Sequence, residues 1–176
     1  MKTARVVFAL FALTVLAFAE DKGGFKNNEF FKAYVGEWEM NGELQKGDGG
    51  VLKIKETWKA EFVGDDTLNI EGTRVIDGNS QDFVWTMTHN PSTGLYEASH
   101  KGSKDSADTQ RFEVSVSETE MKIDMTALLG NNSKIAITDA FTDKEHDTIE
   151  SKITLTDDAG ATTLSGTLTH KRVKKP

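Results

Sequence analysis

Residues 51–76 have the sequence VLKIKETWKAEFVGDDTLNIEGTRVI and carry a pattern that repeats along most of the chain. In residues 51–62 every second side chain is apolar except Glu56, and residues 67–76 alternate in a similar way after a short Gly-Asp turn. Alternation with a period of two is typical of strands that bury one face. The stretch therefore predicts a β-hairpin.

The turn also predicts the register of this hairpin. With the Gly-Asp pair at the centre of the turn, Trp58 faces Gly72 and Glu56 faces Arg74. A bulky ring then covers a glycine, and two inward-facing charges neutralise each other. Because an unpaired buried charge is costly, the Glu56–Arg74 pair supports this register.

The same alternation continues to the C-terminus, and turn residues interrupt it at intervals of about 8–12 residues. One short helix is predicted before it, over residues 27–34, where an asparagine can cap an apolar stripe. The pattern favours an all-β fold, a closed antiparallel up-and-down β-barrel of about ten strands, because closure leaves no exposed strand edge. The predicted strands are residues 35–45, 51–62, 67–76, 82–89, 95–101, 110–116, 120–128, 133–141, 147–156 and 161–173.

The composition limits the classes of protein that fit this pattern. The chain has 176 residues, no cysteine and a formal charge of -7, with a pI near 5.1. Its length fits one domain. The absence of cysteine excludes a disulfide scaffold, a cysteine-ligated metal and a thiol nucleophile. The negative charge argues against nucleic acid as a partner.

Residues 1–19, MKTARVVFALFALTVLAFA, have the features of a cleaved signal peptide: a positive start, an apolar run and a final small-x-small pattern. The apolar run is too short to span a bilayer, so no transmembrane segment is expected in the mature protein. The chain is predicted to be exported, either periplasmic or secreted, without a lipid-modified cysteine. Residues 20–26 are predicted to be a flexible N-terminus, 27–173 a single barrel domain and 174–176 a basic tail.

The residues Gly36-Glu37-Trp38, directly after the predicted helix, form a G-x-W motif that resembles the start of lipocalin and wider calycin barrels. In those proteins the glycine eases the bend into the barrel, and the tryptophan packs at the closed end beneath a basic residue of the last strand. The resemblance implies that Gly36, Trp38 and Arg172 form this structural signature. Arg172 is expected to be the basic residue because it lies four positions after the inward-facing Leu168 and therefore faces the same side of the strand. Such a cation–π contact contributes on the order of 1 kcal/mol.

The layout is also similar to a bacterial lipocalin-like domain family of secreted or periplasmic barrels whose function is mostly unassigned. The matching pieces, within residues 28–173, are the opening VGEWE, the mid-chain HNPSTGLY hairpin and the terminal LTHKR. The resemblance implies a lipocalin-like fold.

More distantly, the barrel resembles haem-binding nitrobindin-like proteins and fatty-acid-binding proteins. Nitrobindin-like proteins ligate haem with a histidine well inside the last strand, where this chain has Ser165, and His170 lies close to that strand's end. Haem is therefore disfavoured, and no cofactor is predicted. Fatty-acid binders hold a carboxylate with inward arginines on late strands, whereas Arg74 lies on an early strand and faces Glu56.

The leading functional prediction is that the barrel interior binds a small, mainly apolar molecule. A closed barrel of this size either fills its interior with side chains or keeps a ligand cavity. A dry cavity of roughly 300 Å³ or more would favour ligand binding. The predicted binding residues all face inward: Glu56, Trp58, Ile70, Arg74, Trp85, Met87, His100, Phe112 and Met125.

Two alternatives stay open: a packed structural or interaction barrel that acts through its surface, and an enzyme that uses Glu56, Arg74 or the histidines. No catalytic residue is assigned, because the chain has no G-x-S-x-G, P-loop or dinucleotide-binding pattern. No metal site is assigned, because the histidines lack metal-ligand spacing. The hairpin at residues 90–94 places His89 and His100 near one pocket, although histidines at hairpin ends are more often structural. The sequence does not indicate an oligomeric state.

Overall fold

The computed structural model describes residues 24–103, 105–130 and 132–174. A 3-10 helix and a short α-helix come first, and ten strands follow. The elements are η1 (Phe25–Asn27), α1 (Glu29–Tyr34), β1 (Gly36–Lys46), β2 (Val51–Phe62), β3 (Thr67–Ile76), β4 (Asn79–Asn90), β5 (Leu95–Lys101), β6 (Gln110–Ser117), β7 (Lys122–Leu128), β8 (Lys134–Phe141), β9 (Thr148–Thr156) and β10 (Thr162–Arg172).

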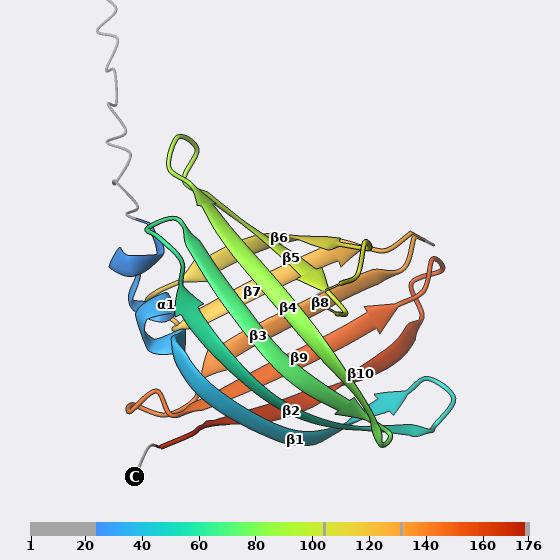
Figure 1. Cartoon of the computed structure of the whole chain (residues 1–176). Helices are drawn as coiled ribbons and strands as arrows, with labels where there is room; N and C mark the ends of the chain where they lie inside the picture. The colour runs from blue at the N-terminus through green and yellow to red at the C-terminus, as the bar shows by residue number, and fades with distance from the viewer. Residues whose placement is uncertain (1–23, 104, 131, 175–176) are drawn as a thin grey trace, which may run out of the picture.

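The strands form one closed barrel in which each strand pairs antiparallel with its neighbours in sequence (Figure 1). β1 pairs with β10 and so completes the ring, with Trp38 opposite Arg172. The predicted up-and-down barrel is confirmed. Closure satisfies the backbone groups that an open sheet would leave at its two edges.

The predicted register of the second hairpin is also confirmed. Glu56 faces Arg74, and Trp58 faces Gly72. A Cβ atom placed on Gly72 would lie 2.7 Å from the Cβ of Trp58 and 2.8 Å from the Cζ of Phe83. Glycine at this position therefore lets two aromatic rings converge on one point of the barrel wall.

The strand limits match the prediction within two residues at every end except the start of β4. Asp77 and Gly78 both have positive φ angles, +47° and +88°. They form a two-residue hairpin turn, for which Asp-Gly is a favoured sequence. Asn79 and Ser80, expected in the turn, therefore belong to β4.

The start of the domain differs from the prediction. Phe25 belongs to η1 and its side chain is fully buried, so regular structure begins before residue 27. The helix α1 begins at Glu29, and the side chain of Asn28 accepts a hydrogen bond from the backbone N–H of Phe31. Predictions for residues 1–23 and 175–176 lie outside the described residues.

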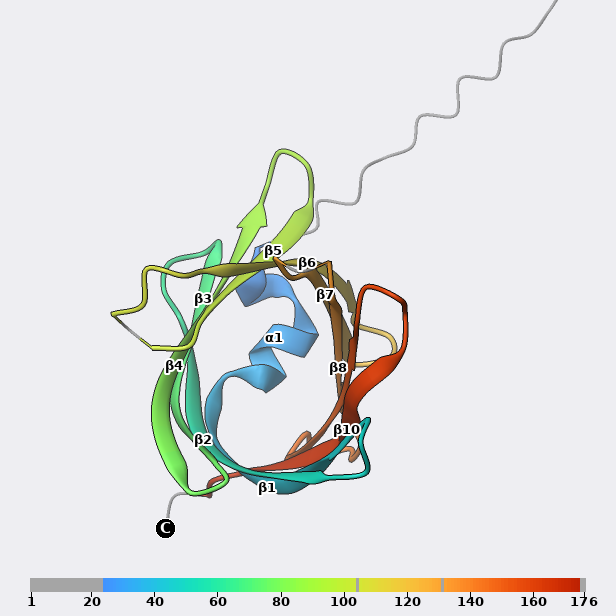
Figure 2. The same cartoon turned by 90° about the vertical axis from the view of Figure 1, so that its right-hand side faces the viewer.

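The helix α1 lies inside the ring of strands at one end of the barrel (Figure 2). Its apolar stripe, Phe30, Phe31 and Tyr34, is buried in the larger of two apolar clusters of the core. A smaller cluster around Met40 and Leu168 fills the opposite part of the interior.

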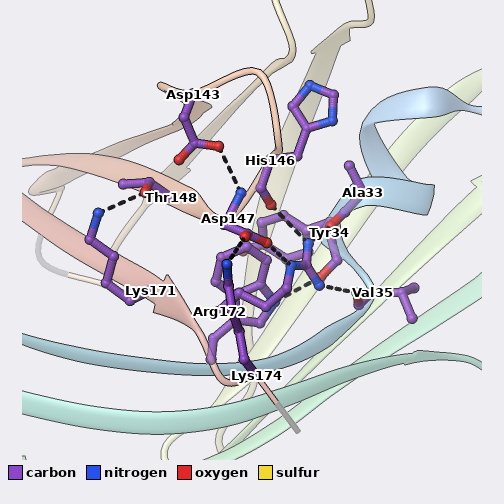
Figure 3. Close-up of polar contacts among 11 residues, drawn as sticks. Ala33, Tyr34, Val35, Asp143, His146, Asp147, Thr148, Lys171, Arg172 and Lys174 are labelled. Atoms are coloured by element: carbon purple, nitrogen blue, oxygen red, sulfur yellow. Dashed lines mark hydrogen bonds and ion pairs between the residues drawn. The ribbon is translucent and has the colours of Figure 1, made fainter. Parts of the chain in front are cut away.

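Arg172, at the end of β10, fastens α1 to the barrel (Figure 3). Its guanidinium donates to the carbonyl oxygens of Ala33 and Val35 at the end of α1 and to that of His146. It pairs with Asp147 at 3.1 Å and lies 4.3 Å from the centre of the Trp38 ring.

Gly36 makes room for this contact. Its φ angle of +141° suits glycine alone, and a Cβ atom there would lie 2.4 Å from Nη1 of Arg172. Gly36, Trp38 and Arg172, the three residues of the structural signature, therefore meet at the end of the barrel that α1 closes.

Candidate functional site

A cavity of about 80 Å³ lies inside the barrel, between α1 and the opposite apolar cluster. One side chain of α1 and inward side chains from seven strands line it. The lining residues are Tyr34, Glu56, Trp58, Ile70, Arg74, Phe83, Trp85, Met87, Met125, Ile137, Asp139, Ser151, Ile153, Leu168 and His170.

Much of the wall is aromatic or aliphatic. The Tyr34 ring lies 5.2 Å from that of Trp58 and so forms the cavity's helical end. Met87 and Met125 are buried on β4 and β7, and methionine side chains adapt easily to a ligand's shape. Such a wall suits an apolar ligand body.

Glu56 and Arg74 form an ion pair on the β2–β3 side of the cavity. The carboxylate accepts a hydrogen bond from Nε of Arg74, and the guanidinium lies 4.8 Å from the centre of the Phe83 ring. The Glu56 side chain is 9% exposed and that of Arg74 22%. The two charges neutralise each other at the cavity wall.

A second polar group is a hydrogen-bonded chain of five side chains. Trp58 donates through Nε1 to Nδ1 of His170 at 3.0 Å. Ser151 Oγ lies 2.9 Å from Nε2 of His170 and donates to Oδ1 of Asp139 at 2.5 Å. The hydroxyl of Tyr34 donates to Oδ2 of Asp139 at 2.9 Å.

The direction of every bond in this chain follows from Trp58, because an indole nitrogen can only donate. Nδ1 of His170 is therefore an acceptor, and the neutral ring carries its proton on Nε2. That proton points to Ser151, whose own proton points to Asp139. The hydrogen bonds from both ends of this series of side chains therefore point toward the carboxylate of Asp139.

Burial shifts the pKa values of these groups. Removal from water raises the pKa of Asp139 to about 6, although the hydrogen bonds from Ser151 and Tyr34 oppose the rise. Burial, with the nearby Arg74 charge, lowers the pKa of His170 to about 4. The pKa of Tyr34 is raised well above 10.0, by burial and then by Asp139. At pH 7 Asp139 is thus ionised and His170 neutral.

Asp139, Ser151 and His170 have the residue types of a hydrolase triad but not its order. In a triad the histidine accepts the serine proton, and the aspartate holds the histidine. Here the serine proton points to the aspartate and the histidine donates to the serine. A histidine with a lowered pKa is also a weak base, so this arrangement does not activate Ser151 as a nucleophile.

The structure brings together seven of the nine predicted ligand-binding residues. Glu56, Trp58, Ile70, Arg74, Trp85, Met87 and Met125 line the cavity. His100 and Phe112 do not, but both pack against Trp85, with ring centres 4.6 Å and 4.8 Å from it. Burial, with Arg74, lowers the pKa of His100 to about 4.

Neither His89 nor His100 lines this cavity. His89 is buried beside Tyr96, with Nδ1 3.2 Å from Oδ1 of Asp66, and it does not line the cavity. His146 lies in the turn before β9, where its carbonyl accepts from Arg172.

Four polar residues of the cavity were not among the binding residues predicted from the sequence: Tyr34, Asp139, Ser151 and His170. A signal for three of them was available, because each is a polar residue at an inward position of an otherwise apolar strand face. Asp139 stands between Ile137 and Phe141, for example. The alternation gives no hint that these positions meet one another.

Metal and haem chemistry find little support in these side chains. No group of three or more His, Asp or Glu side chains within residues 24–103, 105–130 and 132–174 could hold a metal ion. Both ring nitrogens of His170 take part in hydrogen bonds, so neither is free to bind haem iron. His170 therefore does not fit the role of an axial haem ligand.

A larger hollow, of about 580 Å³, lies along the outside of β10, β1, β2 and β3. Its lining is mainly outward and polar, including Glu39, Lys55, Thr57 and Lys171. None of its lining residues is aromatic. The smaller interior cavity is therefore the candidate site.

Comparisons with known proteins give a fold and no family. No family model matches the chain, and no curated protein matches it. Among solved structures, the S-type phycobiliprotein lyase CPES from Guillardia theta is similar over 84% of this chain and 93% of its own, with a TM-score of 0.59 and 11% identity. A de novo designed fluorescence-activating β-barrel (81% and 95% covered, TM-score 0.42, 12% identity) and the redesigned barrel mFAP1 bound to DFHBI (80% and 96%, TM-score 0.40, 15% identity) also match.

None of the helices in the described part of the chain is long and apolar enough to cross a membrane. The similarity to the phycobiliprotein lyase and the closed ring of strands together show the fold. The protein is a ten-stranded antiparallel barrel of the lipocalin/calycin-like fold.

Proposed function

We propose that this protein binds a small, mainly apolar molecule inside its barrel. One observation carries the proposal: aromatic and aliphatic walls enclose a cavity on which an ion pair and a second buried carboxylate also converge. Ligand pockets combine these features, with mostly apolar walls and a few placed polar groups.

The polar side chains that line the cavity argue against a barrel whose interior is only a packed core. Replacing a buried ion pair by well-packed apolar side chains of similar volume is often neutral or stabilising. Glu56, Arg74 and Asp139 therefore contribute little that an apolar core would not supply better. Their presence around a cavity is explained if a ligand uses them.

The size of the cavity limits the ligand. A water molecule needs roughly 10–15 Å³ of such space, so about 80 Å³ holds roughly five to eight groups of that size. A larger ligand requires Met87 and Met125 to change rotamer.

A packed barrel without a ligand is the second candidate, and the same volume favours it. The cavity of about 80 Å³ is smaller than the roughly 300 Å³ at the lower end of typical ligand sites. In that case the role of the protein lies on its surface.

We also propose that the protein is exported, on the basis of residues 1–19 alone. Expression of the full 176-residue sequence in a bacterial host tests this, because cleavage after Ala19 changes the mass of the purified chain. An uncut chain in the cytoplasm would contradict export.

The ligand is tested on the same preparation by comparing native and denaturing mass spectra. Extra mass that disappears on denaturation is the expected result, and its value indicates the chemical class. A bare native mass together with no uptake of an apolar fluorescent probe would overturn the proposal in favour of the packed barrel.

Two variants on β8 provide a matched control. Ile137→Phe fills the cavity and should abolish the extra mass or probe uptake, because Ile137 lines the cavity. Ile135→Phe makes the same change two residues away on the same face, outside the lining, and should preserve binding. Both insertions should cost about 1–3 kcal/mol of stability, so thermal melts must show that each remains folded.

A further inference from the structure

The charges around the cavity do not cancel. Glu56 and Arg74 neutralise each other by direct contact, and His170 is uncharged at neutral pH because its pKa is about 4. Asp139 is the remaining charged side chain among those that line the cavity. The cavity thus has a net charge of about -1 at pH 7 or above.

Asp139 has hydrogen bonds but no counter-ion. Its two oxygens accept from the hydroxyls of Ser151 and Tyr34, which are both neutral donors. The charged neighbour that affects it is Glu56, which repels it. Its side chain forms no ion pair within the described residues, although it is only 5% exposed.

This carboxylate can accept more hydrogen bonds than the protein supplies. Each carboxylate oxygen accepts about two, and each oxygen of Asp139 receives one from a side chain. A buried carboxylate without a cation is costly. A bound cation that donates hydrogen bonds would remove this cost, whereas a bound anion would increase it.

We propose that the ligand is a small primary amine, bound as its ammonium ion with the charge at Asp139 and its apolar body against the aromatic wall. This inference rests on the proposed function and specifies its ligand class. The ammonium donates to the free acceptor positions of Asp139. The rings of Tyr34 and Trp58 line the same cavity and supply part of the aromatic wall for the apolar body.

Benzylamine is a suitable probe because its roughly eight non-hydrogen atoms match the upper size limit of the cavity. Benzyl alcohol has a similar shape without charge, and benzoate has the opposite charge. Binding of each is measured by calorimetry, with quenching of tryptophan fluorescence as a second signal, on the protein purified from expression of the full chain.

At pH 8 benzylamine should bind about 10- to 100-fold more tightly than benzyl alcohol, the range expected for a hydrogen bond to a charged group. Benzoate should bind more weakly than both. Asp139→Asn should remove the preference for the amine. Asp124→Asn removes a charge from the outer face of the neighbouring β7 and should leave the preference intact.

The wild-type protein offers a test that does not depend on whether Asp139→Asn folds. The affinity for benzylamine should fall about tenfold between pH 8 and pH 5, because a carboxyl group with a pKa of about 6 is then mostly protonated. The other groups facing Asp139 are Tyr34 on α1, Glu56 on β2, Arg74 on β3 and His170 on β10. Of these, Tyr34 has a raised pKa and His170 a pKa of about 4, and Glu56 and Arg74 form an ion pair with each other.

The outcomes separate this inference from the proposed function. Equal binding of amine and alcohol, or an amine affinity that does not change with pH, would overturn the amine inference while an interior site survives. Tighter binding of benzoate would also overturn it and would assign Arg74 as the anchor. If no probe binds and the native mass is bare, the proposed function itself fails.

Discussion

Arg172 and Asp139 are both charged and largely removed from water, yet their surroundings differ. Arg172 has a full set of partners: three backbone carbonyls, the carboxylate of Asp147 and the face of Trp38. Asp139 has two neutral hydroxyl donors and no cation. One charge joins parts of the protein, while the other has no cation beside it within the described residues.

The difference separates a charge that has a full set of partners from a charge that has no counter-ion. The closed end around α1 is held without a ligand, because all three nitrogens of the Arg172 guanidinium have acceptors in the protein. The cavity is incomplete, because the cost of the Asp139 charge is offset only in part. Mutations at the two places should therefore affect stability in opposite ways.

Loss of Arg172 should be the most damaging change. Arg172→Ala leaves the carbonyls of Ala33 and Val35 without their donor and releases α1 from the last strand, which should cost about 3–5 kcal/mol. Urea unfolding followed by tryptophan fluorescence measures this loss.

The control is its neighbour on β10. Lys171→Ala removes an outer-face side chain whose ammonium donates to Thr148, and it should change stability by less than about 0.5 kcal/mol. Equal losses in the two variants would contradict the role given to Arg172.

Asp139→Asn should have a pH-dependent effect of about 3 kcal/mol. Because burial raises the pKa of Asp139 from 3.8 to about 6, its native-state proton stabilises the fold at low pH, and this stability is lost as the pH rises through 6. The variant should therefore gain stability relative to the wild type between pH 4 and pH 7.

The comparison with the variant isolates Asp139 from His170. The lowered pKa of His170 acts in the opposite direction, because the unfolded chain binds its proton first as the pH falls below about 6.5. The free energy of unfolding, measured for both proteins at several pH values, gives the difference. A difference that does not change with pH would show that Asp139 is not the buried acid described.

Trp58→Phe should cost about 1–2 kcal/mol more than Trp85→Phe. Both changes trim an indole in the cavity wall. Of these two tryptophans, Trp58 donates a hydrogen bond from its indole nitrogen to His170, whereas Trp85 donates none within the described residues. The larger loss arises because Nδ1 of His170 is left without a donor. Equal losses in chemical denaturation would contradict the direction assigned to the hydrogen-bonded chain.

The fold could be predicted because it depends on local patterns. Alternation selects strands, an Asp-Gly pair closes the turn before β4, and the pairing of Glu56 with Arg74 follows from counting away from one turn. The position of Arg172 over Trp38 followed from its parity together with the resemblance. The buried place of Phe25 could not be predicted, since nothing in its neighbours in sequence shows which end of a barrel it fills.

The cavity was predicted in part. Seven lining residues were predicted correctly because every second residue of a strand faces inward, and these positions can be counted in the sequence. The polar chain was missed because its members come from α1, β2, β8, β9 and β10. Tyr34 and Asp139 are hydrogen-bonded across 105 positions of sequence.

The sequence by itself determined which residues face inward and how neighbouring strands pair, since both depend on a period of two and on short turns. The tertiary structure decided which inward residues meet across the barrel and at what depth. Ring closure and the insertion of α1 set those distances, and alternation holds no information on either. Only the tertiary structure shows that the Asp139 charge is uncompensated, because this depends on which side chains surround the carboxylate.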